Sequence, residues 1–104
     1  MTDYAFTYYG EPRFKNPEED AQHTERFMAW IGSLGEAVVN RDTPLGKTKT
    51  VRSSGVSDFV GSNRLTGFSI VKADNMDAAL EIAKKCPHLE YGTVDVAEVT
   101  EMAT

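Results

Sequence analysis

The stretch that decides the fold is residues 16–35, NPEEDAQHTERFMAWIGSLG. Its apolar side chains recur every three or four residues, which is the spacing of one face of an α-helix. They are Phe27, Trp30, Ile31 and Leu34. His23 lies four residues before Phe27 and therefore on the same face. The pattern predicts an amphipathic helix that packs on a sheet and carries an imidazole on its buried side.

Both ends of this helix are marked in the sequence. Asn16 is a residue type that caps helix N-termini, and Pro17 suits the first helical position. Glu19 stands where a capping box places a carboxylate. Gly35 readily adopts the left-handed conformation that ends a helix. We therefore expect the helix to begin next to Asn16 and to end at Gly35.

Five other segments have the composition or the alternation of β-strands. They are residues 4–9, 36–43, 47–52, 65–73 and 93–99. The segment 47–52 is short and polar, so we interpret it as an extension of 36–43. Residues 53–63, SSGVSDFVGSN, are rich in glycine and serine and have few apolar anchors, which predicts a loop. A loop of this length in a compact domain is often functional.

Residues 75–85 predict a second helix, capped by Asp74 and ended by Cys86-Pro87. Its apolar stripe consists of Met76, Ala79, Leu80 and Ala83. The element order is then β-α-β-β-α-β, which is the α+β ferredoxin-like plait with two helices on one face of an antiparallel sheet. Apolar side chains remain on the other face of the sheet. A second copy of the chain would cover them, which predicts a homodimer with twofold symmetry.

The composition bounds the classes of function. The 104 residues suit a single domain spanning residues 1–104. The net charge of −5 repels phosphate backbones, which argues against nucleic acid as a partner. A single cysteine, Cys86, and no recognisable signal peptide indicate the cytoplasm. No apolar run approaches the ~18–20 residues that a membrane span needs.

His23 is the candidate for proton transfer, because an imidazole can take or give a proton near neutral pH. The alternative is a histidine at the edge of the core that bonds to backbone. Tyr8 could supply a phenol to a pocket or simply pack in the core. His88 stands in a connector and is expected at the surface. The run Cys86-Pro87-His88-Leu89-Glu90 lacks a second pair of metal ligands, so the sequence predicts neither a metal nor a cofactor.

Three blocks of the sequence together resemble the YCII-related family, which includes proteins with a DGPF signature. These blocks are the aromatic first strand, His23 followed by WIGSLG, and the run GVSDFVGSNRLTGFSIVKADNMDAALEIAKKCPHLEYGTVDVAEV. The resemblance covers nearly the whole chain. It implies a ferredoxin-like fold in a dimeric α/β barrel, with a pocket between the sheet and the first helix of each subunit.

The DGPF tetrapeptide itself is absent, although Asp58-Phe59 stands in the corresponding loop. Some members of the family resemble dehydrochlorinases in which a histidine and an aspartate act together, and His23 matches that histidine. We therefore take His23 and Asp58 as candidate catalytic residues, with the Asp58 carboxylate orienting the His23 ring. Further candidates for contact with a ligand are Tyr8, Phe27, Ser57, Ser62 and Asn63.

These residues lead to two hypotheses for function. The first is a lyase-type or isomerase-type enzyme that acts on a small polar or aromatic metabolite with His23 as general acid or base. The second is a non-catalytic domain that binds a small molecule in the same pocket. A purely structural reading makes the dimer an interaction module. The surroundings of His23 discriminate between catalysis and binding.

Overall fold

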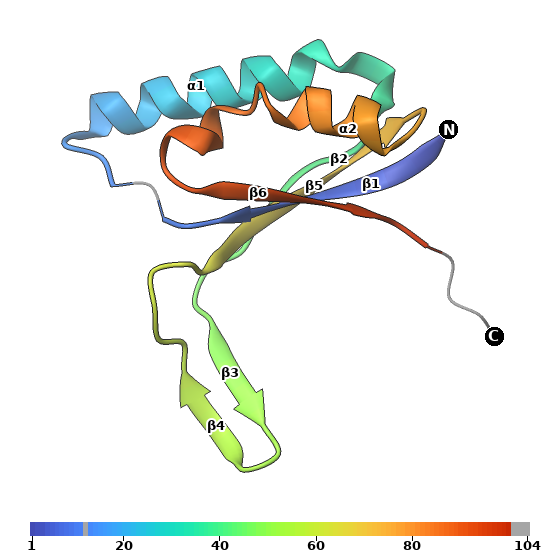
Figure 1. Cartoon of the computed structure of the whole chain (residues 1–104). Coiled ribbons are helices and arrows are strands. Elements are labelled where there is room, and N and C mark those ends of the chain that lie inside the picture. The colour runs from blue at the N-terminus through green and yellow to red at the C-terminus, as the bar shows by residue number, and fades with distance from the viewer. Residues whose placement is uncertain (12, 101–104) are drawn as a thin grey trace.

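The computed structural model describes residues 1–11 and 13–100, in which a four-stranded antiparallel sheet carries two α-helices on one face (Figure 1). The strands of this sheet are β1 (Thr2–Tyr9), β2 (Val38–Pro44), β5 (Leu65–Ala73) and β6 (Thr93–Glu98). The helices are α1 (Pro17–Ser33) and α2 (Met76–Ala83). Two short 3₁₀ turns, η1 (Gly35–Ala37) and η2 (Pro87–Glu90), link helices to strands.

The strand order is β2–β5–β1–β6, with all three pairings antiparallel. β1 and the long strand β5 are the two central strands, and their pairing runs from Thr2 opposite Ala73 to Tyr9 opposite Leu65. This order and the two helices on a single face are those of the ferredoxin-like plait. The fold class predicted from the sequence is confirmed.

Helix α1 begins as its sequence predicts. The side-chain Oδ1 of Asn16 accepts a hydrogen bond of 2.8 Å from the backbone N–H of Glu19, and Pro17 is the first helical residue. The helix ends at Ser33, and Gly35 adopts a positive φ of 56° just beyond it. These two ends fix which residues of α1 face the sheet.

The core lies between the helices and the sheet. From β1 it receives Tyr4, Phe6 and Tyr8, which alternate with the partly exposed residues of the other face. Helix α1 contributes Trp30 and Ile31, and β5 contributes Val71. The rings of Phe6 and Trp30 stack with centroids 6.2 Å apart. His23 lies on the same buried face of α1, as the spacing predicted.

Residues 47–63 differ from the prediction. The strand β3 (Lys49–Arg52) does not extend β2 but pairs with β4 (Gly55–Asp58), inside the segment that we expected to be a loop. The two strands form a hairpin that projects from the sheet on the side opposite the helices (Figure 1). Nearly every hairpin side chain is exposed, so no buried apolar face imposes the period-two pattern that marks a strand in sequence.

Two smaller expectations at helix α2 were wrong. The cap is Asn75 rather than Asp74, because the Asn75 side chain accepts a hydrogen bond of 2.8 Å from the Ala78 N–H. Of the predicted stripe only the two alanines are buried, whereas Met76 and Leu80 are 37% and 40% exposed. The helix is only eight residues long and leaves these larger side chains at its border with solvent.

Candidate functional site

A cavity of about 190 Å³ lies between helix α1 and the sheet. Its lining comes from five elements of the fold: β1, α1, β2, β5 and η2. The lining residues are Tyr8, His23, Thr24, Phe27, Met28, Asp42, Thr66, Gly67 and His88. The chain contains two histidines, separated by 65 positions, and the fold brings both to this cavity. The alternation of β1 and the helical period of α1 explain why Tyr8, His23 and Phe27 point to the same space.

His23 is 8% exposed and is held among aromatic rings. Its ring centroid lies 4.9 Å from that of Tyr91, edge to face, and 5.5 Å from that of Phe14. Within residues 1–11 and 13–100, Nδ1 of His23 is the one buried side-chain nitrogen or oxygen without a hydrogen-bond partner. Native proteins usually satisfy buried polar atoms, so this unpartnered nitrogen is an exception that sets His23 apart from the rest of the described core.

The surroundings of His23 favour its neutral form. Burial lowers the pKa of His23 below its ordinary value of 6.5, and electrostatic repulsion from the directions of Arg26 and His88 lowers it further. The carboxylates of Glu90 and Asp20 act in the opposite direction with smaller effect. An imidazole that is neutral at pH 7 can exchange a proton with a bound molecule.

The structure corrects the expectation that His88 lies at the surface. His88 is 4% exposed, and its Nε2 lies 2.7 Å from the carbonyl oxygen of Tyr9. Its ring also contacts the ring of Tyr8, with centroids 5.6 Å apart. Sequence reasoning missed this residue because the contact joins positions 79 residues apart and depends on where η2 meets the end of β1.

Tyr8 lines the cavity with its hydroxyl already engaged. The hydroxyl donates a 2.7 Å hydrogen bond to Oγ of Ser69, which in turn donates to the carbonyl oxygen of Arg41. Burial raises the pKa of Tyr8 well above its ordinary value of 10, and the hydrogen bond to Ser69 offsets only part of that effect. Tyr8 therefore stays protonated and shapes the cavity as a neutral group.

Asp42 is a cavity carboxylate that sequence reasoning did not single out. It lies on strand β2, most of whose residues are exposed. Its Oδ1 approaches Gly67 so closely that a Cβ added at position 67 would lie 3.2 Å from this oxygen. Removal from water raises the pKa of Asp42, and a hydrogen bond from the Thr43 backbone N–H acts against that. The sequence does hold one indication of this approach, the glycine at position 67 inside the strand LTGFSIV. A glycine inside a strand often marks a place where another group comes close.

The other predicted site residues lie elsewhere in the chain's fold. Asp58 is on β4, where its carboxylate forms a 2.6 Å ion pair with Nζ of Lys49, and its neighbour Ser57 accepts a hydrogen bond from Arg52. The arrangement does not bring Asp58 to His23 within this chain. The catalytic role assigned to the pair stays a prediction.

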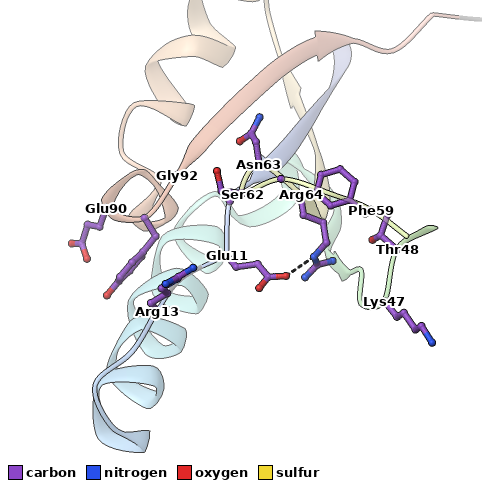
Figure 2. A pocket seen from close by; sticks show the side chains of 13 residues that line it. Glu11, Arg13, Lys47, Thr48, Phe59, Ser62, Asn63, Arg64, Glu90 and Gly92 are labelled. Carbon is purple, nitrogen blue, oxygen red and sulfur yellow. Dashed lines mark hydrogen bonds and ion pairs between the residues drawn. The ribbon is translucent and has the colours of Figure 1, made fainter. Parts of the chain in front are cut away.

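Ser62 and Asn63 line a second, wider depression of about 760 Å³ at the base of the hairpin. Figure 2 shows that an ion pair between Arg64 and Glu11 lies across this depression. Nη1 of Arg64 also donates to the carbonyl oxygens of Leu45 and Gly46, which fixes the hairpin to the sheet. The ligand-binding role of Ser62 and Asn63 stays a prediction.

Residues 1–11 and 13–100 contain no group of three or more histidine, cysteine or acidic side chains that could hold a metal ion. Cys86 is buried, and burial raises the pKa of its thiol to about 11, so it is not an activated nucleophile. Over the same residues, no helix has the length and hydropathy to cross a membrane.

The ferredoxin-like plait with a cavity under its first helix places the chain among small α+β proteins with a site between helix and sheet. The family model of the YCII-related domain matches residues 2–103, and the chain therefore belongs to the YCII-related family. The curated proteins contain no significant match.

A solved structure with a similar fold is the 5-chloro-2-hydroxyhydroquinone dehydrochlorinase (TftG) of Burkholderia phenoliruptrix AC1100, in complex with 2,5-dihydroxybenzoquinone. The comparison covers 96% of this chain and 95% of that chain, with a TM-score of 0.61 and 12% sequence identity. At this identity the likeness shows a shared fold.

Proposed function

We propose that the chain is a small cytoplasmic enzyme of the lyase or isomerase type, with His23 as the general acid or base in the cavity under α1. Its substrate is a small hydroxylated molecule, the class bound by the dehydrochlorinase of similar fold. The observation that carries the proposal is the buried, predominantly neutral imidazole of His23 at a cavity of a size suited to one ring. Aromatic neighbours around it suit a planar ligand.

A test replaces His23 by glutamine, which is close in size but does not exchange protons. Thermal stabilisation by a panel of hydroxylated aromatic and enolic acids would first identify a ligand, and turnover of that ligand would then be measured. Loss of a general acid or base lowers the rate by roughly 10²–10⁴-fold, so we expect His23→Gln to lose at least two orders of magnitude. Gln22→Ala, an exposed neighbour on α1, is the control and should keep the wild-type rate. Full activity in His23→Gln would exclude the role.

The alternative is a domain that binds the same class of molecule without turnover. One observation favours it: the buried Nδ1 of His23 has no hydrogen-bond partner, whereas a catalytic histidine is commonly oriented by one. Ligand stabilisation that is equal in wild type and His23→Gln, with no product from any member of the panel, would support this alternative.

We further propose that the chain acts as a homodimer built on the sheet face opposite the helices. Thr7, Tyr9, Phe68 and Ile70 lie on that face and are only partly buried in one chain. The chain exposes 7249 Å², which exceeds the roughly 5,800 Å² expected for a compact monomer of 11.5 kDa. An interface of standard size removes about 800 Å² from each partner, which is less than this excess, although part of the excess belongs to the exposed β3–β4 hairpin.

Sedimentation equilibrium tests the homodimer. We expect a mass twice the 11.5 kDa of the chain at micromolar concentration. Phe68→Glu would place a charge in the middle of the proposed interface and is expected to yield folded monomers. Leu89→Glu, at an exposed position on the helix side, should leave the mass unchanged. A wild-type chain that stays monomeric at every concentration would contradict the proposed assembly.

A further inference from the structure

The two histidines of the cavity present different nitrogens to a ligand. The Nε2 of His88 lies 2.7 Å from the carbonyl oxygen of Tyr9. A carbonyl oxygen only accepts hydrogen bonds, so the proton of the neutral His88 ring resides on Nε2. Its Nδ1 then carries a lone pair, and His88 lines the cavity. The Tyr9 carbonyl fixes the orientation and the tautomer of this ring. Catalytic histidines are commonly oriented in the same way, by an acceptor bound to the nitrogen that does not face the substrate.

In His23 the two ring nitrogens have the opposite roles: the nitrogen without a partner is Nδ1, and Nε2 is the one expected to meet a ligand. Its Nδ1 is buried and has no acceptor nearby, and a buried N–H without an acceptor is more costly than a buried lone pair without a donor. The proton of the neutral His23 ring is therefore expected on Nε2. In that form His23 offers an N–H to the cavity and acts as a hydrogen-bond donor.

The remaining ionisable groups around His88 are poorer proton acceptors. Tyr8 and Cys86 are both held protonated by burial. Asp42 also lines the cavity, beside Gly67, and its pKa is raised by burial, but a carboxylate is intrinsically a weaker base than an imidazole. Glu90, two residues beyond His88, is engaged in a 2.8 Å ion pair with Arg26. Of the groups that line the cavity, the neutral ring of His88 is thus the strongest free proton acceptor.

We propose that His88 is the general base of the site and that His23 is its general acid, which presents its Nε2–H to the ligand. The ligand class is a small planar molecule with an acidic hydroxyl at one end and an oxygen acceptor at the other. The proton passes from the ligand O–H to Nδ1 of His88, which breaks the O–H bond and leaves a ligand oxyanion and an imidazolium. The imidazolium keeps its Nε2–H on the Tyr9 carbonyl, and the Nε2–H of His23 binds the oxygen onto which the negative charge spreads. This assignment rests on the proposed function, because it divides the acid–base work of the same cavity.

A suitable probe is 4-nitrophenol, which has a hydroxyl opposite a nitro group and turns yellow when it ionises. At a pH below the pKa of the free probe, adding wild-type protein is expected to raise the phenolate absorbance. Glutamine can keep an N–H near the position of Nε2 but lacks the Nδ1 lone pair. His88→Gln should therefore abolish the phenolate signal and weaken binding about tenfold, which corresponds to about 1.4 kcal/mol. Lys72→Gln, an exposed change on β5, is the control.

The variants separate the failure of this assignment from the failure of the proposed function. A wild-type phenolate signal and wild-type affinity in His88→Gln would overturn the assignment, and so would the absence of a phenolate signal in the wild type. Loss of the signal in His23→Gln but not in His88→Gln would also overturn it, while His23 would stand as the acid–base group. Wild-type affinity in His23→Phe, which removes the N–H, would instead contradict the role of His23.

A measurement without mutation guards against a His88 variant that fails to fold. Because the chain contains only two histidines, a ¹H–¹⁵N spectrum of the imidazole rings resolves both. Above the ordinary pKa of an imidazole, the assignment requires that His88 carry its proton on Nε2 and show an unprotonated Nδ1. A proton on Nδ1 of His88 would overturn the assignment.

Discussion

Replacing Trp30 by alanine is expected to lower the free energy of unfolding by about 3–5 kcal/mol. Trp30 is 9% exposed, and its ring packs against Phe6 and Phe27 with centroids 6.2 and 5.6 Å away. Its Nε1 donates a 3.3 Å hydrogen bond to the carbonyl oxygen of Ile82, so the side chain also joins α1 to α2. Total stabilities of small domains are about 5–15 kcal/mol, so the substitution should leave the fold marginal.

Urea unfolding followed by far-ultraviolet circular dichroism would measure this effect, because Trp30 is the only tryptophan and fluorescence is lost with it. Met28→Ala is the matched control, since Met28 lies on the same helix and is 43% exposed. We expect the control to change stability by less than about 1 kcal/mol. Equal losses in the two variants would show that α1 does not pack on the sheet through Trp30.

Gly92→Ala is expected to destabilise the protein by about 3 kcal/mol, the upper end of the range for overpacking. A Cβ at position 92 would lie 1.9 Å from the carbonyl oxygen of Tyr9 and 3.0 Å from Nε2 of His88. The carbonyl belongs to the backbone of a central strand and cannot move aside cheaply. The substitution therefore separates His88 from its hydrogen-bond acceptor as well as distorting the start of β6.

Gly46→Ala provides the control for this substitution, because a Cβ at position 46 meets nothing within 4 Å. Its stability should match or slightly exceed that of the wild type, since alanine restricts the unfolded chain. Differential scanning calorimetry of the three proteins would compare them. A Gly92→Ala protein as stable as Gly46→Ala would contradict the close packing of η2 against the end of β1.

The sequence predicted those parts of the fold that local physical chemistry determines. Helix α1 was located by its cap and its apolar period, and strand β5 was predicted with its bounds, 65–73, because β-branched and aromatic residues fill it. Strand β3 was predicted within residues 47–52, but its partner β4, and with it the hairpin, was missed since the hairpin buries almost nothing. Its strands are held by backbone pairing, from Lys49 opposite Asp58 to Arg52 opposite Gly55, which leaves no trace in apolar spacing.

The residues of the candidate site show the same difference between local patterns, which the sequence reveals, and long-range packing, which it does not. His23, Tyr8 and Phe27 were predicted because each lies on a periodic face, and the structure brings the three to one cavity. His88 and Asp42 were missed because they reach the cavity through long-range packing of a 3₁₀ turn and an edge strand. Asp58 was chosen for its place in a loop, but the segment folds as a hairpin strand and its carboxylate binds Lys49.

The central claim is that His23 is a buried, neutral imidazole at a ligand cavity, and an NMR titration of its ring tests this most directly. The account predicts a His23 pKa below 6.5. The folded protein then binds fewer protons than the unfolded chain between the two pKa values, so the free energy of unfolding should fall as the pH drops through about 6.5 toward the folded pKa. A His23 that titrates at or above 6.5, with stability unchanged over that interval, would contradict the account.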